Sequence, residues 1–300
     1  MRKAIVTGAT GAIGTSLIKE LIRKNVEVLV FTRKNSKRNS NIPNSNLVSI
    51  EYCSLSDIKN IDNNTQKQYD AFFHLAWAGT TGEGRNDKDL QAKNVEYALD
   101  AVKCAKKFGC KKFIGIGSQA EYGRVMSALT PTTECNPENE YGKAKLQAGT
   151  KTRELANKLG LQHNWVRVLS VYGPNDGENS LISYAINKCK LNEELELTKC
   201  EQVWDYLFSE DAAEAIYKIA ESGINNKTYV LGSGETKELK EFVYLIKNIC
   251  NSNSNLLFGT KPYNDKQVMY LKADISDLKK DIKWSPKTVF EEGIKIIVGA

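Results

Sequence analysis

A chain of 300 residues is long enough to bury a substantial core, and it exceeds the size of one average domain. Hydrophobic residues make up 41% and charged residues 26% of the chain, a globular composition that excludes disordered and fibrous proteins. The net charge of +6 is modest, no apolar stretch approaches the length of a membrane span, and Met1 leads directly into a strand-like run without room for a signal peptide. We therefore expect a soluble cytoplasmic protein with no nucleic-acid or membrane partner.

The seven cysteines are scattered singly along the chain. They lack the paired spacings that a zinc site or a disulfide framework requires. We therefore expect reduced, mostly structural cysteines and no bound metal.

The first half of the chain alternates between strand-like and helical patterns. Apolar, strand-like runs occupy residues 3–7, 26–31, 70–76 and 112–117, and helical patterns occupy residues 12–24, 88–108 and 141–159. Residues 160–168 follow a helix that Gly160 would end and are predicted as the next strand. Such alternation predicts parallel strands whose connecting helices cover the sheet. We therefore expect an α/β fold with a doubly wound parallel sheet of at least five strands.

The elements become shorter and less regular after Pro174. Helices are predicted near residues 180–190, 209–222 and 236–250, strands near residues 194–199 and 227–231, and a polar loop at residues 251–255. We place the main sheet in residues 1–173, with segments near residues 203–232 returning to it. Residues 174–300 are expected to form mainly a smaller C-terminal lobe.

A glycine-rich loop directly follows the first strand and opens the first helix. In this position Gly8 permits a tight turn, Gly11 removes a side chain where a pyrophosphate approaches the backbone, and Gly14 lets helix and strand pack closely. Ala12 and Ile13 begin the helix, whose N-terminus faces the anion. The pattern predicts a dinucleotide site in a Rossmann-type domain, with a turn that binds no ligand as the alternative. Its Gly-x-x-Gly-x-x-Gly spacing resembles the short-chain dehydrogenase/reductase superfamily.

Thr32 and Arg33 stand at the end of the second strand, where the chain would meet the adenine ribose of a dinucleotide. An acidic residue there would bond the ribose hydroxyls of NAD, whereas a guanidinium pairs with the 2′-phosphate of NADP. Lys34, Lys37 and Arg38 extend this basic cluster, which a solvated surface loop also explains. We expect NADP(H) as the cofactor and keep NAD(H) as the alternative.

Tyr141 and Lys145 are four residues apart in a predicted helix and therefore lie on one face of it. A nearby ammonium favours the ionised phenol, so we expect a lowered pKa for Tyr141 and a role in proton transfer. Lys145 would also hold the nicotinamide ribose. Ser118 follows the strand 112–117 at the carboxyl edge of the sheet, where ligands bind, and can donate a hydrogen bond to a substrate oxygen.

These motifs occur together with four further segments: His74-Leu75-Ala76, Asn94, Val171-Tyr172-Gly173-Pro174 and Trp204-Asp205-Tyr206. As a set they resemble the extended short-chain dehydrogenases/reductases, the nucleotide-sugar epimerase/dehydratase/reductase family, over residues 2 to about 215. The resemblance implies Ser118, Tyr141 and Lys145 as the catalytic triad and a substrate-binding role for the C-terminal lobe. It implies further cofactor contacts by Leu55, Ala76 and Asn94. It places the following residues beside the substrate: Thr80, Ser118, Gln119, Tyr141 and Trp204.

The chain departs from the pattern of this family at several positions. The 4,6-dehydratases of the family carry an Asp-Glu pair after the catalytic hydroxyl residue, where this chain has Gln119 and Ala120. Neither side chain can protonate a leaving hydroxyl or remove a proton, so we do not expect water elimination. Ser54 stands where the family often has an acidic residue that contacts adenine. Trp204 stands in place of an arginine that binds substrate phosphate, and Ser170 in place of an asparagine. These departures leave open which nucleotide the substrate carries.

We therefore expect an NADP(H)-dependent reductase of a nucleotide-activated 4-keto sugar, acting in deoxysugar or surface-polysaccharide synthesis. Hydride moves to C4, Tyr141 supplies the proton and Ser118 orients the oxygen. An NAD-dependent nucleotide-sugar 4-epimerase would use the same residues, and a non-catalytic dinucleotide-sensing protein is the alternative of another class. The family often pairs the helices 88–108 and 141–159 between subunits, and their apolar positions predict a homodimer.

Overall fold

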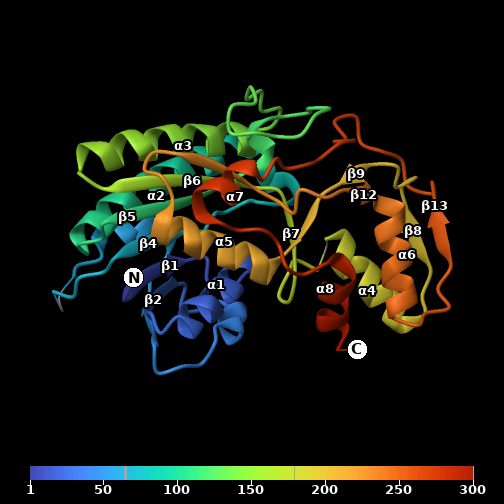
Figure 1. Ribbon diagram of the computed structural model, residues 1–300, viewed down its shortest axis with the longest axis horizontal. Helices are drawn as coiled ribbons and strands as arrows, with labels where there is room; N and C mark the ends of the chain where they lie inside the picture. The colour runs from blue at the N-terminus through green and yellow to red at the C-terminus, as the bar shows by residue number, and fades with distance from the viewer. Residues whose placement is uncertain (64–65, 179, 300) are drawn as a thin grey trace.

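The centre of the structure is a parallel β-sheet (Figure 1). The computed structural model describes residues 1–63, 66–178 and 180–299, and within them the sheet has seven strands in the order β11-β6-β5-β4-β1-β2-β3. The strands are Lys3–Thr7 (β1), Glu27–Thr32 (β2), Val48–Tyr52 (β3), Ala71–His74 (β4), Lys112–Ser118 (β5), Gln162–Val168 (β6) and Thr228–Leu231 (β11). All neighbouring strands pair in parallel, which confirms the predicted α/β fold with a doubly wound sheet.

Helices cover both faces of the sheet, as apolar parallel strands require. Helices α2 (Lys88–Lys107) and α3 (Glu140–Lys158) lie on one face, and α1 (Ala12–Arg23), α5 (Ser209–Ser222) and α7 (Ser276–Ile282) lie on the other. Adjacent residues of β1 divide between the faces: Ile5 packs in the core with α2 and α3, and Val6 in the core with α1 and α5. Because both faces are covered, the carboxyl edge of the sheet is where its side chains reach a ligand.

A smaller lobe lies beside the sheet, at the right in Figure 1. Its elements are α4 (Leu181–Leu191), β8 (Leu195–Leu197), β9 (Val203–Trp204), β12 (Lys237–Glu238), α6 (Leu239–Ile249), β13 (Leu256–Phe258) and α8 (Phe290–Val298). The lobe has a core of its own, in which the rings of Tyr206, Phe242 and Phe290 are in mutual contact. The strands β7 (Ser170–Tyr172) and β10 (Tyr206–Phe208) pair in parallel where the lobe meets the sheet.

The predicted elements agree with the structure to within a few residues. The helices expected near 180–190 and 236–250 are α4 and α6, and the strand expected near 194–199 is β8. Of the described residues near 203–232, β11 joins the sheet and α5 covers it, whereas β9 pairs with β12 and β10 with β7. Helix α7, which the sequence did not predict, also packs in the core of the sheet. The division of the chain into two domains stays a prediction.

A buried carboxylate ties the smaller lobe to the end of β11. Asp205 has 0% exposure and accepts hydrogen bonds from the backbone N–H groups of Ser233, Gly234 and Ala273. The hydroxyl of Ser233 donates to it as well. Burial raises the pKa of Asp205, and these hydrogen bonds lower it. The network holds the neighbouring residue, Trp204, in place relative to the sheet.

Many apolar positions of α2 and α3 are buried within the chain, whereas Leu90, Tyr97 and Leu146 are half-exposed. Val95 and Ala98 of α2 pack with Ala144 and Ala148 of α3 in a core that includes Trp165. Exposed positions of the two helices carry charged residues: Lys93, Glu96, Lys103, Lys106, Lys107, Lys143, Lys151, Glu154 and Lys158. The apolar pattern therefore has an explanation within one chain, and the homodimer stays a prediction.

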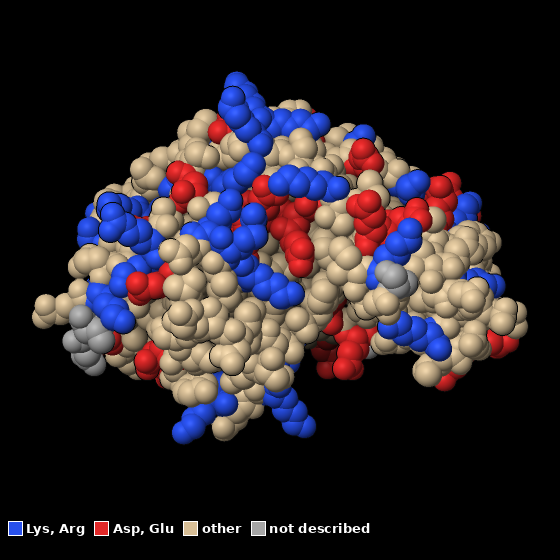
Figure 2. Space-filling model, turned by 60° about the horizontal axis from the view of Figure 1, so that its bottom comes forward, with Lys and Arg blue, Asp and Glu red and all other residues tan. Residues whose placement is uncertain are grey.

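Charge, hydropathy and cysteines are those of an ordinary globular protein. Figure 2 shows lysine and arginine side chains mixed with aspartate and glutamate side chains over the face that it presents. Among the described residues, no helix has both the length and the apolar character needed to cross a membrane. All seven cysteines are free, and burial raises the pKa of Cys53 and Cys104 to about 12, which keeps these thiols protonated and unreactive.

Candidate active site

A cleft lies at the carboxyl edge of the sheet, where β1 has β2 on one side and β4 on the other. In open α/β sheets a ligand binds at such a point, because the order of the strands reverses there. The cleft has a volume of about 330 Å³ and joins the glycine loop to the segments that follow β4, β5 and β6. We call it the glycine-loop cleft. The predicted site residues that line it are Gly8, Gly11, Ala12, Ile13, Gly14, Thr80, Ser118, Tyr141 and Lys145.

Packing of the chain requires a glycine at two of the three loop positions, each for a different structural reason, and not at the third. Gly8 has a φ of +74°, and a Cβ there would lie 2.6 Å from the backbone nitrogen of Ala76. A Cβ on Gly14 would lie 2.2 Å from the carbonyl oxygen of Gly8, so this glycine lets α1 approach the loop. At Gly11 a Cβ would meet no atom within 4 Å. Packing of the chain therefore does not require a glycine at position 11, whereas a phosphate lying against the backbone does.

The N-terminus of α1 is open to a ligand. Gly11 is the N-cap residue and supplies no side-chain hydrogen bond to the first turn, and that turn contains no acidic residue. Uncapped N–H groups, together with the positive end of the helix dipole, favour an anion. The residues present therefore fit the pyrophosphate of a dinucleotide.

The structure brings the three predicted catalytic side chains into this cleft. Ser118 ends β5, and Tyr141 lies in the first turn of α3. Lys145 lies one turn further along α3. Its Nζ donates to the carbonyl oxygen of Ile116 at 2.7 Å and lies 3.8 Å from the centroid of the Trp77 ring. A phenol, a hydroxyl and an ammonium thus share one cavity.

The expectation that Lys145 lowers the pKa of Tyr141 is wrong. Tyr141 is 8% exposed, and burial raises the pKa of its phenol. A hydrogen bond with Ser118 and the charge of Arg85 act in the opposite direction. The ammonium of Lys145 is instead bound to the carbonyl of Ile116, and it lies 5.8 Å from the centroid of the Tyr141 ring. A phenol with a raised pKa is protonated at neutral pH, which suits a proton donor.

A buried carboxylate that the sequence analysis missed holds the Ser118 segment in place. Glu121 has 0% exposure; it accepts hydrogen bonds from the backbone N–H of Ser118 at 2.9 Å and from Nε1 of Trp165 at 3.0 Å. It also forms an ion pair with Nε of Arg167 at 2.7 Å. Glu121 also affects Lys145. Burial lowers the pKa of Lys145 to about 7, and the negative charge of Glu121 acts against this lowering. The available signal in the sequence is the Ser-x-x-Glu spacing of a capping box, which the structure confirms.

Two side chains from the loop after β4 contact the ring of Tyr141, and neither was predicted. The Cζ atom of Arg85 lies 4.4 Å from the ring centroid, and the ring of Trp77 stands edge-on at a centroid distance of 6.3 Å. Gln91 of α2 holds this loop: it accepts from Nε1 of Trp77 at 2.8 Å and donates to two carbonyl oxygens of the loop at 2.9 and 2.7 Å. No motif marks Arg85, because its contact depends on how this loop folds.

A second cleft, of about 510 Å³, lies next to the first. Its walls include Arg85 from the loop after β4, Gln119 from the segment after β5, Trp204 from β9, and residues 264–268. We call it the Trp204 cleft. Gln119 and Trp204, both predicted to lie beside the substrate, are therefore in this cleft, whereas Thr80 is in the glycine-loop cleft.

Two of the residues that depart from the pattern of the resembled family are in direct contact. Nε1 of Trp204 donates to Oγ of Ser170 at 2.7 Å. An asparagine and an arginine were expected at these two positions. Because the serine accepts the indole N–H, the two departures form one structural unit in the wall of the Trp204 cleft.

Five of the predicted cofactor residues do not contribute to the described lining of either cleft: Thr32, Arg33, Leu55, Ala76 and Asn94. Asn94 holds the segment after β4, accepting from the N–H of Ala78 at 3.0 Å and donating to its carbonyl oxygen at 2.9 Å. Ala76 donates to Oγ1 of Thr7 at 3.3 Å. Leu55 packs against the core, and Thr32 donates to Asn39 at 2.9 Å. These residues support the cleft or lie at the end of a neighbouring strand.

The basic loop after β2 reaches across to other parts of the chain. Nη2 of Arg38 donates to the carbonyl oxygen of Asn175 at 2.7 Å, and Nδ2 of Asn41 donates to the carbonyl oxygen of Thr10, in the glycine loop, at 3.2 Å. Arg33 is exposed and has no ion pair within the described ranges of the chain. Arg33 is therefore the better placed of the two arginines to meet an added phosphate.

Both histidines are packed in the core. His74 Nδ1 shares a hydrogen bond with Oγ1 of Thr7 at 3.0 Å, and His163 Nε2 shares one with Oγ1 of Thr152 at 3.0 Å. Burial lowers the pKa of each histidine to about 3. Both rings are therefore neutral and structural. Over the part of the chain that the structure describes, no group of three or more His, Cys, Asp or Glu residues is placed to hold a metal ion.

Known proteins resemble this chain in sequence and in fold. A sequence model of the NAD dependent epimerase/dehydratase family matches residues 4–232. CDP-abequose synthase of Salmonella muenchen is 27% identical over 306 residues, covering 98% of this chain and 96% of that protein. The dTDP-4-dehydro-6-deoxyglucose reductase of Escherichia coli is 23% identical over 306 residues, with the same coverage of 98% and 96%.

Among solved structures, UDP-glucose 4-epimerase of Thermotoga maritima with UDP-glucose has a TM-score of 0.88 at 24% identity. The match covers 99% of this chain and 97% of that one. At this identity the likeness concerns the fold, and it agrees with the Rossmann-type sheet and the smaller lobe described above.

Proposed function

The chain belongs to the NAD-dependent epimerase/dehydratase family, and we propose that it is an NADP(H)-dependent reductase of a nucleotide-activated 4-keto sugar. The family membership and the relatives named for CDP- and dTDP-linked sugars support an enzyme that acts on a nucleotide sugar with a nicotinamide cofactor. In the proposed reaction a hydride adds to C4 and a proton adds to the carbonyl oxygen. The product would enter deoxysugar or surface-polysaccharide synthesis.

The observation that carries this proposal is the set of polar groups around the phenol. Elimination of water would need one group to protonate the leaving hydroxyl and another to remove a proton, but Gln119 and Ala120 can do neither. The next carboxylate, Glu121, is fully buried and already paired with an arginine. The phenol of Tyr141 and the hydroxyl of Ser118 remain. They are sufficient to deliver a proton to a carbonyl oxygen without any elimination.

Each residue of the triad has its own role in the proposed reduction. A phenol is protonated at neutral pH, and burial raises the pKa of Tyr141 further, so Tyr141 can give its proton to the oxygen at C4. Ser118 donates a hydrogen bond to the same oxygen and so polarises the carbonyl. Lys145 would bind the nicotinamide ribose through its ammonium group. The dinucleotide, when bound, supplies the hydride.

The preference for NADP(H) rests on the end of β2. Thr32 places no carboxylate there to repel a 2′-phosphate. Arg33 is exposed and lacks an ion-pair partner among residues 1–63, 66–178 and 180–299, so its guanidinium is free to pair with that phosphate. NAD(H) is the alternative, and a comparison of the two affinities decides between them.

The Trp204 cleft is the proposed site for the nucleotide part of the substrate. It lies beside the glycine-loop cleft and is larger, at about 510 Å³ compared with about 330 Å³. Gln119 lines the Trp204 cleft, and its chain neighbour Ser118 lines the glycine-loop cleft. A sugar at Ser118 would therefore extend its nucleotide towards Trp204.

The proposal is tested by mixing the protein with NADPH and either dTDP-4-dehydro-6-deoxyglucose or its CDP counterpart. We expect one NADPH to be oxidised for each sugar reduced, followed by absorbance, and a product heavier by two hydrogens in mass spectrometry. In a second assay, with NAD⁺ and a nucleotide sugar that carries a C4 hydroxyl, interconversion of the C4 epimers without net reduction of NAD⁺ would identify a 4-epimerase instead. Dinucleotide binding without turnover of any nucleotide sugar would favour a sensor.

A further inference from the structure

Arg85 lies where the two clefts meet. Its Cζ atom is 4.4 Å from the centroid of the Tyr141 ring, which lines the glycine-loop cleft, while Arg85 itself lines the Trp204 cleft. Its Nη1 donates to the carbonyl oxygen of Thr80 at 2.9 Å. Gln91, only 1% exposed, donates to the carbonyl oxygen of Gly84 at 2.7 Å and so holds the residue next to Arg85. The position of this half-buried guanidinium is therefore set by the fold.

Arg85 differs from the other two cations that line the Trp204 cleft. Arg124 forms an ion pair with Glu138 at 2.8 Å, and Nζ of Lys266 donates to the carbonyl oxygen of Glu138 at 3.3 Å. Arg85, like Lys266, has no carboxylate partner among the described residues, but Lys266 is exposed, whereas Arg85 is half-buried and lies over the Tyr141 ring. A guanidinium over an aromatic ring can still donate hydrogen bonds from its N–H groups, and here Nη1 already donates to Thr80. Arg85 is thus a cation of this cleft that is positioned but not neutralised.

Building on the reductase function proposed above, we propose that Arg85 is a substrate-binding residue. It donates hydrogen bonds to oxygen atoms of the sugar diphosphate where the substrate passes from the Trp204 cleft to Tyr141. A nucleotide sugar carries two negative charges on its diphosphate, and its sugar has to reach the phenol for proton transfer. A fixed, unpaired guanidinium between the two clefts fits both requirements.

The same cation acts on the proton donor. The charge of Arg85 and a hydrogen bond with Ser118 lower the pKa of Tyr141, whereas burial and the charge of Glu121 raise it. Nζ of Lys145, whose pKa is lowered by burial to about 7, lies 5.8 Å from the ring centroid. Loss of the Arg85 charge should therefore raise the pKa of Tyr141 and make it a weaker acid. Since the proton donor must be protonated, the part of the fall in kcat/KM that lies above the titration of Lys145 and reports Tyr141 should move to higher pH.

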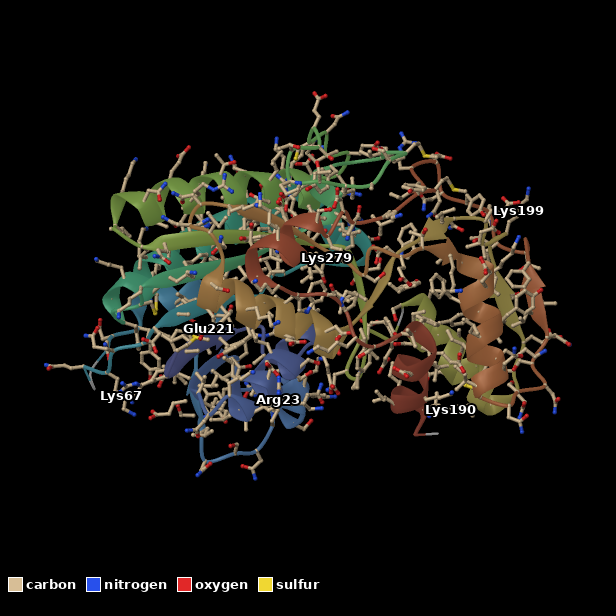
Figure 3. All side chains as sticks on the ribbon, in the orientation of Figure 1. Arg23, Lys67, Lys190, Lys199, Glu221 and Lys279 are labelled. Carbon is tan, nitrogen blue, oxygen red and sulfur yellow. The ribbon has the colours of Figure 1, made fainter. Side chains whose placement is uncertain are left out.

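Two variants of Arg85 and one control test this role. Arg85→Gln removes the charge, and Arg85→Lys keeps the charge but not the planar fork. The control, Arg23→Gln, removes an exposed guanidinium on α1, which is labelled in Figure 3 and pairs with Glu20. The probes are dTDP-4-dehydro-6-deoxyglucose and its CDP counterpart, each with NADPH. A melting curve for each variant shows that it is folded.

We expect Arg85→Gln to raise KM for the nucleotide sugar roughly 10- to 100-fold, the size of a lost hydrogen bond to a charged group. The Kd for NADPH should stay within about twofold of the wild-type value, since Arg85 does not line the glycine-loop cleft. Arg85→Lys should recover part of the loss, and Arg23→Gln should behave as wild type. A wild-type KM together with an unshifted high-pH limb in Arg85→Gln overturns the proposal.

Failure of the reductase function can be told apart from failure of this inference. If the wild type oxidises NADPH with neither sugar, the proposed function is wrong. The role of Arg85 is then decided by calorimetry of the same two nucleotide sugars with wild type and Arg85→Gln. Weaker binding by the variant supports the substrate-binding role, whereas equal affinities, or no binding by the wild type, overturn it.

Discussion

The glycine-loop cleft and the Trp204 cleft are built in different ways. The first combines backbone, in the glycine loop and at a helix N-terminus, with side chains such as Ser118, Tyr141 and Lys145 that short sequence motifs place there. The second takes its walls from side chains far apart in the chain, such as Gln119, Trp204 and residues 264–268. The backbone part of the first cleft follows from the fold, whereas walls made of side chains can change without changing the fold. The cofactor chemistry is therefore the more general property of this chain, and the substrate the more individual one.

The largest expected effect is that of Tyr141→Phe, a variant that should impair proton transfer in the first cleft but not cofactor binding. Tyr141→Phe keeps the ring that contacts Trp77 and Arg85 and removes the phenolic hydroxyl. Turnover of the nucleotide sugar should fall roughly 10²- to 10⁴-fold, the range of general acid catalysis, while the affinity for NADPH changes little. Steady-state kinetics and a fluorescence titration with NADPH measure the two quantities.

The matched control for this variant is Tyr244→Phe. Tyr244 lies on α6 and is 50% exposed, so loss of its hydroxyl should leave turnover as in the wild type. Near-normal reduction by Tyr141→Phe would assign the proton to another group, such as a water held by Ser118. The first cleft would then provide binding but not the acid.

The difference between the clefts also explains what the sequence could predict about the site. The glycine spacing, Ser118 after a strand and the Tyr141–Lys145 pair each depend on one short segment, so pattern and position were sufficient. Arg85 and Glu121 were missed because their roles depend on contacts between segments. Arg85 acts on a ring in another helix, and Glu121 is paired with an arginine on β6.

The fold shows the same division between local and non-local signals. The inner strands β1, β4 and β5 are buried on both faces and are mostly apolar, so their positions were predicted to within about two residues. Strand β3 is at the edge of the sheet, with Ile50 and Tyr52 exposed at 39% and 53%. Because its sequence mixes polar and apolar residues, the start and end of this strand were not predicted. The direction of the pKa shift of Tyr141 was predicted wrongly, because spacing in a helix shows which residues share a face but not where Lys145 donates its hydrogen bond.

A pair of glycine variants tests whether the first cleft is built as described. Gly14→Ala should lower the free energy of unfolding by about 1–3 kcal/mol, because its Cβ would lie 2.2 Å from the carbonyl oxygen of Gly8. Gly11→Ala should leave stability within about 0.5 kcal/mol, since a Cβ there meets no atom within 4 Å. Its Kd for NADPH should nevertheless rise, because the methyl group occupies the space of the pyrophosphate. Unchanged NADPH affinity in a folded Gly11→Ala protein would contradict the phosphate site.

The 2′-phosphate preference is tested at the rim of the same cleft. Arg33→Ala should raise the Kd for NADPH roughly 10- to 100-fold, the effect of losing a charge-assisted hydrogen bond, and leave the Kd for NADH nearly unchanged. Arg23→Ala, an exposed arginine at the other end of α1, is the control. Calorimetry with both dinucleotides gives the values. Tighter binding of NADH than of NADPH by the wild type would reverse the cofactor assignment.

The smallest expected effect belongs to the Trp204 cleft. Ser170→Ala removes the acceptor that lies 2.7 Å from Nε1 of Trp204 and leaves the N–H of a half-buried indole without that partner. A neutral hydrogen bond contributes about 0.5–1.5 kcal/mol, so KM for the nucleotide sugar should rise about two- to tenfold as the indole loses its fixed position. Ser222→Ala, which removes an exposed hydroxyl at the end of α5, should leave KM unchanged. NADPH affinity should stay as in the wild type, because Ser170 does not line the glycine-loop cleft. If Ser170→Ala weakened binding of NADPH as much as binding of the nucleotide sugar, the two clefts would act as one site, and the cofactor could not be assigned to one cleft and the substrate to the other.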